Sequence, residues 1–184
     1  TVKIIPFGVP RAAVERCLDI ADAPMLKVAP FRELRVALLQ SRLPGLKPEL
    51  IKKTVDVTRA KLADIGAKLV RQKVCKHDEL DIAIRVELAR KGCDVVLVIG
   101  ASAIVDRRDE IPRAILEYGG EIVRFGMPVD PGNLTLLARF RHIHVIGLPG
   151  SARSPRLHGS DYILRRIAAG IEVTADDITR TSWI

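Results

Sequence analysis

Small residues, carboxylates and arginines gather in four short stretches of the sequence. The stretches are residues 77–78, 100–109, 126–133 and 147–155. Glycines and small side chains let backbone N–H groups approach phosphate oxygens closely, and an arginine fork binds an anion through two hydrogen bonds. This composition favours anion recognition. Ordinary tight turns also use Gly and Pro, so a purely structural interpretation of each stretch stays open.

Each stretch follows a segment with the pattern of a strand. Apolar runs predict strands at about residues 36–39, 68–75, 95–99, 121–125 and 143–146. Helical spacing of apolar residues predicts helices at about residues 48–65, 79–91, 111–118 and 158–169, and a further helix from residue 174. The helix that starts at Glu79 has Leu80, Ile84 and Leu88 on one face. In the helix at 158–169, Ile163, Leu164 and Ile167 are expected to point inward.

The alternation of strands and helices predicts a three-layer α/β/α fold. Its sheet should be mainly parallel, with right-handed crossovers. Ligands of such sheets bind beyond the carboxyl ends of the strands. We therefore expect the four stretches to converge on one pocket that accepts an anion.

The first 34 residues do not share this regular pattern. They predict a strand at 2–7, a helix at 10–21 and a short strand at 25–28. We interpret residues 1–34 as an appendage or the tail of a preceding domain, and residues 35–184 as the main domain. The sequence starts at Thr1 without an initiator Met, so we expect it to be part of a longer protein.

Composition excludes several classes of function. The formal net charge is +8, but residues 1–91 carry 19 basic and 11 acidic side chains, whereas residues 92–184 carry 11 of each. Aromatic residues make up only 4%, which argues against nucleic acid as a partner. No apolar run reaches the roughly 18 residues of a membrane span. Three scattered cysteines fit neither a disulfide framework nor a metal site, so we expect reduced thiols and a cytoplasmic protein.

Individual side chains leave alternatives open. Asp78 and Asp109 have the chemistry to hold Mg²⁺, but both precede predicted helices and are equally suited to capping. Arg153 lies within a Gly-Ser loop, where it is suited to phosphate, and Arg108 is either a phosphate ligand or a solvated charge. Asp130 and Asn133 are ligand contacts or turn formers.

The histidines do not suggest a metal site or a hydrolase. His142 and His144 alternate along a predicted strand, but no third metal ligand is evident. His158, near a helix start, is better suited to contact an anion than to act as a base. The sequence contains no Ser-His-Asp or Cys-His arrangement of recognisable spacing, no Walker A loop and no Gly-x-Gly-x-x-Gly fingerprint.

Several motifs together resemble a known family. They are Thr1 to Phe7, Gly100-Ala101-Ser102-Ala103, Asp106-Arg107-Arg108-Asp109, Phe125 to Leu134, and Gly147-Leu148-Pro149-Gly150. Over residues of about 35 to 170 they are similar to the molybdopterin-binding domains of molybdenum cofactor biosynthesis, the fold shared by molybdopterin adenylyltransferases and molybdotransferases. Over nearly the whole chain they resemble the molybdopterin-binding portion of bacterial proteins that join this domain to a cytidylyltransferase-like nucleotidyltransferase.

The resemblance implies roles for matching positions. Asp78 and Asp109 would hold the pterin or assist chemistry at its phosphate. The implied ligand cradle consists of Gly100, Ala101, Ser102, Ala103, Arg108, Asp130, Pro131, Gly132, Asn133, Pro149, Gly150, Ser151 and Arg153. The resemblance further implies molybdopterin as the ligand, Mg²⁺ and ATP or CTP as co-reactants, and a homo-oligomer, either trimer or dimer.

The chain also departs from the family pattern. Ala101 and Ala103 replace two glycines of the family's Gly-Gly-Thr-Gly loop, and Asp106 is an insertion relative to the adenylyltransferases. Added methyl groups restrict backbone angles, and binding survives such changes more easily than catalysis. We therefore expect a molybdopterin-binding module. The alternatives are an active nucleotidyl or metal transferase and a structural, oligomerising domain that binds nothing.

Overall fold

The computed structural model describes residues 8–21 and 27–180, and the statements below concern these residues. Contacts between residues divide the chain into two units, 1–30 and 31–184. In the first unit, α1 (Arg11–Ile20) forms where a helix is expected, and none of its side chains is buried. The strand expected at 2–7 lies outside the described residues, as do residues 25 and 26. Lys27 and Val28 adopt no strand conformation, and Val28, which has no neighbouring strand, is 99% exposed.

The second unit is built around a sheet of six strands in the order β2-β1-β3-β6-β5-β4. The strands are β1 (Arg35–Arg42), β2 (Lys68–Lys76), β3 (Val95–Ile99), β4 (Gly120–Phe125), β5 (Leu136–Phe140) and β6 (Ile143–Leu148). Strand β1 pairs in parallel with β2 and β3, and β3 pairs in parallel with β6. Strand β5 runs antiparallel to its two neighbours, so the other five strands share one direction. The sheet is therefore mainly parallel, as expected.

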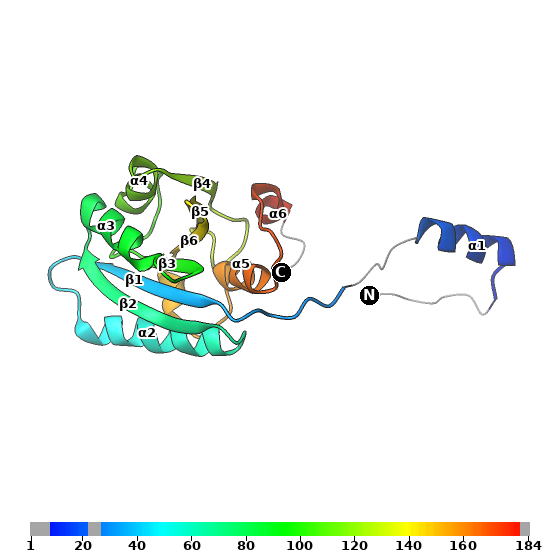
Figure 1. Cartoon of the computed structure of the whole chain (residues 1–184), viewed down its shortest axis with the longest axis horizontal. Coiled ribbons are helices and arrows are strands. Elements are labelled where there is room, and N and C mark those ends of the chain that lie inside the picture. Colours follow the sequence, from blue (N-terminus) through cyan, green and yellow to red (C-terminus); the bar gives the residue numbers. More distant parts are fainter. Residues whose placement is uncertain (1–7, 22–26, 181–184) are drawn as a thin grey trace. The chain divides into compact units, whose positions relative to one another are not determined.

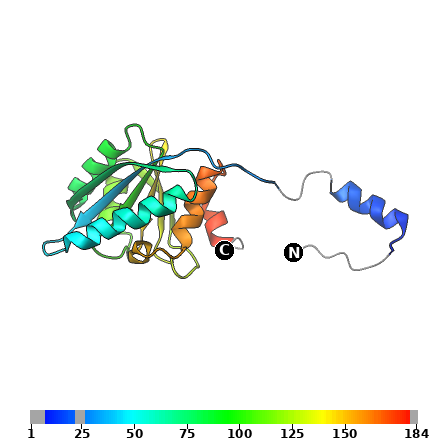
Figure 2. The ribbon, with the colours of Figure 1, turned by 90° about the horizontal axis from the view of Figure 1, so that it is seen from below.

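Helices cover both faces of this sheet (Figure 1). They are α2 (Pro48–Ala63), α3 (Glu79–Ala89), α4 (Glu110–Glu117), α5 (Gly159–Ala168) and α6 (Ala175–Arg180), with a short 3-10 helix η1 (Gly150–Arg153). Seen from below, α2 lies across the sheet near β1 and β2, with α5 on the same face (Figure 2). Helices α3 and α4 pack on the opposite face. The three-layer α/β/α expectation is confirmed.

Two apolar cores fill the spaces between the layers. Towards α2, α5 and α6, alternate strand residues such as Val36, Leu38 and Leu97 pack with Leu62 and Ile163. The intervening strand residues, for example Leu39, Val96 and Val98, face α3 and α4 and pack with Ile82 and Ile111. Because each central strand is covered on both faces, it reads as a continuous apolar run.

Strand β5 is the element that the sequence pattern did not predict. Its residues Leu136, Leu137, Ala138 and Phe140 are almost completely buried. The strand is only five residues long and is joined to β6 by the two residues Arg141 and His142. Strand β3 has the same length but is apolar throughout, whereas Arg139 interrupts the run in β5 and leaves only three consecutive apolar residues. Pairing on both sides, with β4 and β6, stabilises it.

Helix α3 turns a different face to the core from the one that the spacing suggests. Leu80, Ile84 and Leu88 lie on one side of the helix, but they are 52%, 45% and 47% exposed. The buried residues of α3 are Ile82, Ala83, Val86 and Ala89. Both sets have helical spacing, so the spacing alone does not decide which one packs on the sheet. In α5 the expected inward face, with Ile163, Leu164 and Ile167, is confirmed.

Candidate functional site

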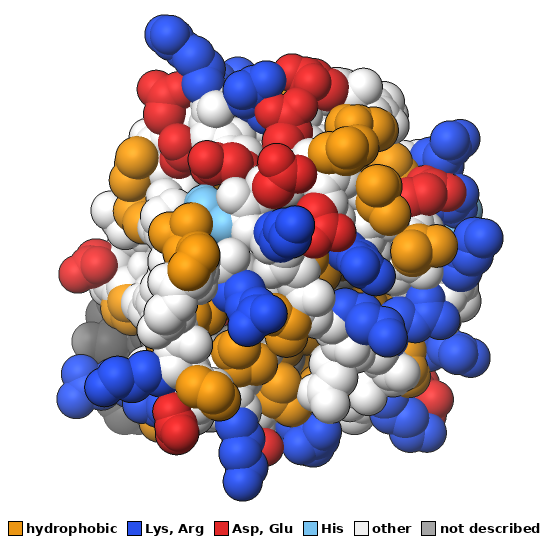
Figure 3. All heavy atoms as spheres, turned by 90° about the vertical axis from the view of Figure 1, so that its left-hand side faces the viewer, with side chains coloured by type: hydrophobic (Ala, Val, Ile, Leu, Met, Phe, Trp, Pro, Cys, Tyr) orange, Lys and Arg blue, Asp and Glu red, His pale blue; other side chains and the backbone are white. Residues whose placement is uncertain are grey.

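The four stretches singled out in the sequence lie at one end of the sheet, called the carboxyl edge below because the parallel strands finish there. Strands β2, β3, β4 and β6 share one direction, so the segments that follow them all emerge at this edge. Figure 3 looks onto this side of the molecule, the left-hand side of Figure 1. Acidic side chains are most frequent in its upper part, where Lys and Arg also lie, and Lys and Arg predominate on the right and below, with apolar side chains among them. Acidic and basic side chains are therefore unevenly distributed over this side of the molecule.

A histidine joins three strand ends. His77, the first residue after β2, has a side chain that is only 7% exposed. Its Nδ1 lies 2.8 Å from Oγ of Ser41 in β1, and its Nε2 lies 3.1 Å from Oγ of Ser102, beyond β3. Glu110, in the first turn of α4, places Oε2 3.3 Å from the same Nε2. Ser41 is itself buried and accepts a 3.3 Å hydrogen bond from the Ala101 N–H.

This arrangement does not form a nucleophilic triad. In a Ser-His-acid triad the nucleophile and the acid contact different nitrogens of the imidazole ring. Here the exposed Ser102 shares Nε2 with Glu110, and Ser41, which faces Nδ1, is buried and so cannot reach a substrate. The geometry thus fits polar positioning of the Ser102 loop better than hydrolysis.

Arg153 is the second residue that joins two strand ends. It closes η1, after β6, and its Nη2 donates a 3.1 Å hydrogen bond to the carbonyl oxygen of Gly100. Its Nε–H is buried and has no hydrogen-bond partner among the described residues. Burial lowers the pKa of the guanidinium, and no carboxylate offsets this effect. A half-buried cation without an acidic partner is costly unless an anion accompanies it.

Close packing fixes the Gly100 loop, residues 100–103, which contacts both His77 and Arg153. A Cβ atom on Gly100 would lie 2.6 Å from the carbonyl oxygen of Ser102 and 3.6 Å from Cε1 of His77. Ala101 and Ala103, at positions where the resemblance implies glycines, do not have positive φ angles, so their methyl groups cause no backbone strain. Ala103 is exposed. The departure from the family pattern is thus compatible with an ordered loop.

The segment 104–109 connects the Gly100 loop to the start of α4. Asp109 accepts hydrogen bonds at Oδ2 from the N–H groups of Val105 and Asp106, at 2.7 and 3.0 Å, and so closes its own loop. It makes no side-chain capping bond to α4. Arg107 lies over the ring of Phe125 at the end of β4, 6.0 Å from the centroid. The side chain of Arg108 is 92% exposed and lies 3.8 Å from Asp106.

Asp78 caps a helix in this structure. Its Oδ1 accepts a 3.1 Å hydrogen bond from the Asp81 N–H in the first turn of α3. Asp78 is exposed and follows His77 directly. Capping therefore accounts for its position in the chain, and its second carboxylate oxygen makes no hydrogen bond among the described residues.

The segment 126–133 docks on the start of α5 and stands apart from His77. The Gly159 N–H donates a 3.0 Å hydrogen bond to the Pro131 carbonyl oxygen. Gly132 has a φ of +127°, and a Cβ there would lie 2.5 Å from the Gly159 nitrogen. Asp130, joined to Pro131 by a cis peptide bond, is exposed. Asn133 is also exposed and accepts a hydrogen bond from the Met127 N–H through its backbone carbonyl.

The segment after β6 links the two groups. Pro149 is buried and precedes η1, in which Gly150 and Ser151 are exposed. Arg153 then reaches the Gly100 loop, and the chain continues to Gly159. The four stretches are therefore joined by contacts, but they form two neighbouring groups. One group is centred on His77, Gly100 and Arg153, and the other on Gly132 and Gly159.

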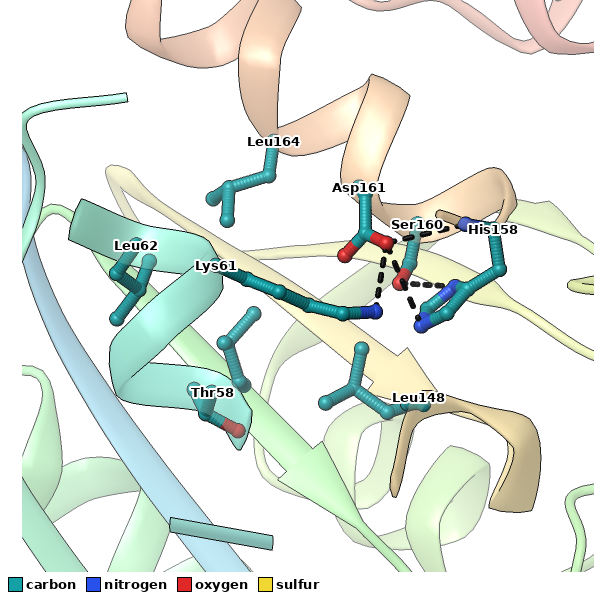
Figure 4. A pocket seen from close by; sticks show the side chains of 10 residues that line it. Thr58, Lys61, Leu62, Leu148, His158, Ser160, Asp161 and Leu164 are labelled. Atoms are coloured by element: carbon teal, nitrogen blue, oxygen red, sulfur yellow. Dashed lines mark hydrogen bonds and ion pairs between the residues drawn. The ribbon is translucent and has the colours of Figure 1, made fainter. Parts of the chain in front are cut away.

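Behind the second group, α2 and α5 enclose a small cavity of about 20 Å³. Lys61 and Asp161 form an ion pair at 2.7 Å beside it, and each side chain is only 12% exposed (Figure 4). His158, also drawn there, has a side chain that is 1% exposed and is hydrogen-bonded through Nδ1 to Ser160. Burial lowers the pKa of His158 despite the nearby Asp161 carboxylate. His158 is thus a core residue, and the expectation that it contacts an anion is wrong.

Sequence reasoning did not single out three residues of the His77 group. Ser41 and Glu110 were not considered, and His77 was noted only as a neighbour of Asp78. One signal was present, because Ser41 is a polar residue at the end of the apolar run of β1. The pairing of β1 between β2 and β3, which places Ser41 beside His77, follows only from the fold.

The residues of the first group fit the phosphate end of a ligand. The Nε–H of Arg153 has no hydrogen-bond partner among the described residues and its charge has no acidic partner, so an anion would stabilise it, while Gly100 itself is buried and leaves no room for a side chain. Among the described residues, no cluster of three or more His, Cys, Asp or Glu side chains could hold a metal ion. No described helix is both long and apolar enough to cross a membrane.

Comparison with solved structures shows the same fold in several proteins. The molybdopterin biosynthesis MoeA protein from Pyrococcus horikoshii is 24% identical with a TM-score of 0.50, over 65% of this chain and 30% of that one. The protein CinA from Thermoplasma acidophilum, described as having unknown function, is 13% identical with a TM-score of 0.52, over 66% and 90%. The molybdopterin biosynthesis enzyme MoaB from Thermus thermophilus is 18% identical with a TM-score of 0.52, over 73% and 89%.

Sequence comparisons give the family. A search of curated proteins found no significant match. The model of the family described as "Probable molybdopterin binding domain" matches residues 53–169, which is more than half of the chain. The matched segment includes His77, the Gly100 loop and Arg153. The chain therefore belongs to the family of probable molybdopterin-binding domains.

Proposed function

We propose that this chain binds molybdopterin in molybdenum cofactor biosynthesis and that Arg153 holds the pterin's terminal phosphate. The family match and the fold support the ligand class. The observation that carries the site is the half-buried Arg153 guanidinium, which has no acidic partner and faces the Gly100 loop. A bound phosphate compensates this charge and accepts hydrogen bonds from the loop.

Titration of the purified chain with molybdopterin tests this proposal. Arg153→Gln keeps a polar side chain but removes the charge, and we expect it to weaken binding by about tenfold to a hundredfold, the usual worth of a charge-assisted hydrogen bond. The matched control is Arg156→Gln, an exposed arginine in the same loop, which should retain nearly full affinity. Equal affinity of the Arg153→Gln variant and the parent chain would place the phosphate elsewhere.

We infer that the chain acts as a binding module rather than as the catalyst. Asp78 and Asp109, the residues proposed to hold pterin or Mg²⁺, are both engaged by backbone N–H groups in this structure. Incubation with molybdopterin, Mg²⁺ and either ATP or CTP, followed by mass spectrometry, separates the alternatives. Unchanged pterin supports the module, whereas an adenylylated or cytidylylated product supports transferase activity. Failure to bind any pterin would leave a structural domain.

The remaining features of the proposal concern the larger assembly. We propose that a nucleotidyltransferase domain accompanies this one in a longer, cytoplasmic protein, and that residues 1–34 form a separate appendage. We also propose self-association into a trimer or dimer, for which the exposed Leu80, Ile84 and Leu88 of α3 offer an apolar surface. Sedimentation equilibrium of the parent chain and of an Ile84→Glu variant tests this last point.

A further inference from the structure

His77 and Glu110 have no role in the proposed function so far, although His77 contacts Ser102 of the Gly100 loop and Glu110 lies beside His77. The hydrogen-bond network indicates which nitrogen of His77 carries a proton. Ser41 accepts at Oγ from the Ala101 N–H, and its own hydroxyl hydrogen is then free to donate to Nδ1. A bare Nε2 would direct its lone pair at the Glu110 carboxylate, 3.3 Å away, which is repulsive. The neutral form with the proton on Nε2 donates its hydrogen bond to Ser102 Oγ and turns an N–H, not a lone pair, towards the Glu110 carboxylate, and in the charged form Nε2 is also a donor.

His77 thus presents an N–H donor towards the Gly100 loop. Gly100 lies between this imidazole ring and the Arg153 guanidinium, which approach it from β2 and from η1. Ser102, the acceptor at 3.1 Å from Nε2, is exposed and retains its hydroxyl hydrogen for another partner. Donors from His77 and Arg153 therefore flank the Gly100 loop, and Ser102 within that loop offers a third.

Glu110 is a carboxylate of the protein itself that lies beside the His77 donor. Its side chain is 45% exposed, and no other ion pair to a described residue is found within 4 Å. A partly exposed contact of this kind contributes little stability, so an external anion can replace it at small cost. No carboxylate in the described part of the chain neutralises Arg153 in this way.

We propose that His77 Nε2–H is a second ligand for phosphate and that the Glu110 carboxylate occupies its place until a phosphate group displaces it. This inference rests on the proposed function, because it concerns the same edge of the sheet. It assigns specificity to the site. A phosphate with two negative charges competes with Glu110 better than a ligand with one, so the pair selects for terminal phosphate groups, whether carried by the pterin or by a nucleotide.

A double-mutant cycle on the full chain tests this role. The probes are molybdopterin, inorganic pyrophosphate, and ATP or CTP, each titrated by calorimetry. The variants are His77→Phe, which removes the donor, Glu110→Gln, which removes the competing charge, and the double variant. Glu117→Gln is the matched control, because it removes one carboxylate from the same helix at a residue that pairs with Arg113 instead.

We expect His77→Phe to weaken binding of the phosphate-bearing probe by about tenfold, the effect of one charge-assisted hydrogen bond. Glu110→Gln should strengthen it severalfold, and this gain should disappear in the His77→Phe background. His77→Gln, whose side-chain amide offers an N–H donor, should recover part of the loss. Glu117→Gln should leave the affinity nearly unchanged. Circular dichroism of each variant verifies folding, and His77→Gln provides the test if His77→Phe does not fold.

The outcomes separate this inference from the proposed function. If molybdopterin binding depends on Arg153 but neither His77 nor Glu110 variants alter it, the second ligand does not exist. The same conclusion follows if the Glu110→Gln gain persists without His77, because Glu110 then acts only through its overall charge. If pyrophosphate or a nucleotide shows the full coupling while molybdopterin does not bind, the phosphate site stands and the pterin assignment fails.

Discussion

The Nζ atom of Lys61 lies 2.7 Å from Oδ2 of Asp161, and this ion pair ties α2 to the first turn of α5. Lys61 also donates a 2.9 Å hydrogen bond to the carbonyl oxygen of Arg156. Asp161 Oδ2 accepts a second bond, from the His158 N–H. Together these contacts hold the loop that carries Arg153 against α2. The pair is thus part of the framework that positions the candidate site.

Removal of one partner of this pair should be costly. Asp161→Ala leaves the Lys61 ammonium without its partner and the His158 N–H without an acceptor, so we expect a loss of about 3 kcal/mol in the free energy of unfolding. Lys61→Met should cost less, because the Asp161 carboxylate keeps the backbone bond. Asp56→Ala, in the exposed pair with Arg59, is the control and should cost less than about 1 kcal/mol. Urea denaturation measures all three, and equal values for Asp161 and Asp56 would contradict this assignment.

The buried histidines should make the fold sensitive to mild acid. Burial lowers the pKa of both His144 and His158 below their usual value near 6.5. Below that pH the unfolded chain binds protons that the folded chain does not, so the free energy of unfolding decreases as the pH falls. The decrease should start near pH 6.5 and continue down to the lowered pKa values. Urea midpoints measured from about pH 8 to about pH 5 test this, and His158→Gln should have the shallower slope.

The two faces of α3 should respond differently to truncation. Ile82 is completely buried against the sheet, so Ile82→Ala should cost about 2–5 kcal/mol. Ile84 is 45% exposed, and Ile84→Ala should cost no more than about 0.5 kcal/mol in the monomer. Denaturation at two protein concentrations separates any contribution from self-association. A larger loss at Ile84 would mean that the sequence-predicted face of Leu80, Ile84 and Leu88 is the one that packs on the sheet.

These two faces illustrate what the sequence reveals about the fold. Strands β1 and β3 and helices α2 and α5 were predictable, because their apolar patterns reflect burial on both faces of a strand or on one face of a helix. The pattern of α3 is ambiguous, since the residues at 80, 84 and 88 and those at 82, 83, 86 and 89 both have helical spacing. Strand β5 is as long as β3, but Arg139 interrupts its apolar run after three residues, and pairing with its two neighbours defines it.

The candidate site was also only partly predictable from the sequence. The loops with Gly100 and Arg153 were predictable, because small residues and an arginine after strands have a direct chemical meaning. The partners of His77 were not, because they depend on which strands are neighbours: Ser41 is separated from His77 by 36 positions in the chain. His158 was predicted to be better suited to contact an anion than to act as a base from its place near a helix start, whereas its side chain is buried at the start of α5.

Gly100 should tolerate no side chain without a change in the loop. A Cβ would meet the backbone oxygen of Ser102 at 2.6 Å, and a backbone atom cannot move aside as a flexible side chain does. We expect Gly100→Ala to shift the loop, to weaken the Arg153 bond to the Gly100 carbonyl, and to reduce pyrophosphate affinity. Gly150→Ala is the control, because the nearest atom to a Cβ there is Nη1 of Arg153, at 3.8 Å. Equal affinities for these two variants would show that the loop does not contact the anion.

The three cysteines should differ sharply in reactivity, which tests the core behind β2 and β3. Burial is the main cause that raises the pKa of Cys75 to about 12, and burial also raises the pKa of Cys93. Cys17 in α1 is exposed. Because the thiolate is the reactive form, iodoacetamide at about pH 8 should modify Cys17 rapidly and the other two only after urea unfolds the chain. Peptide mass spectrometry locates the label, with Cys17→Ser as the control. Rapid modification of Cys75 in the folded chain would show that α3 does not cover the carboxyl end of β2, and that His77, two residues further on, lacks the rigid support that the phosphate site requires.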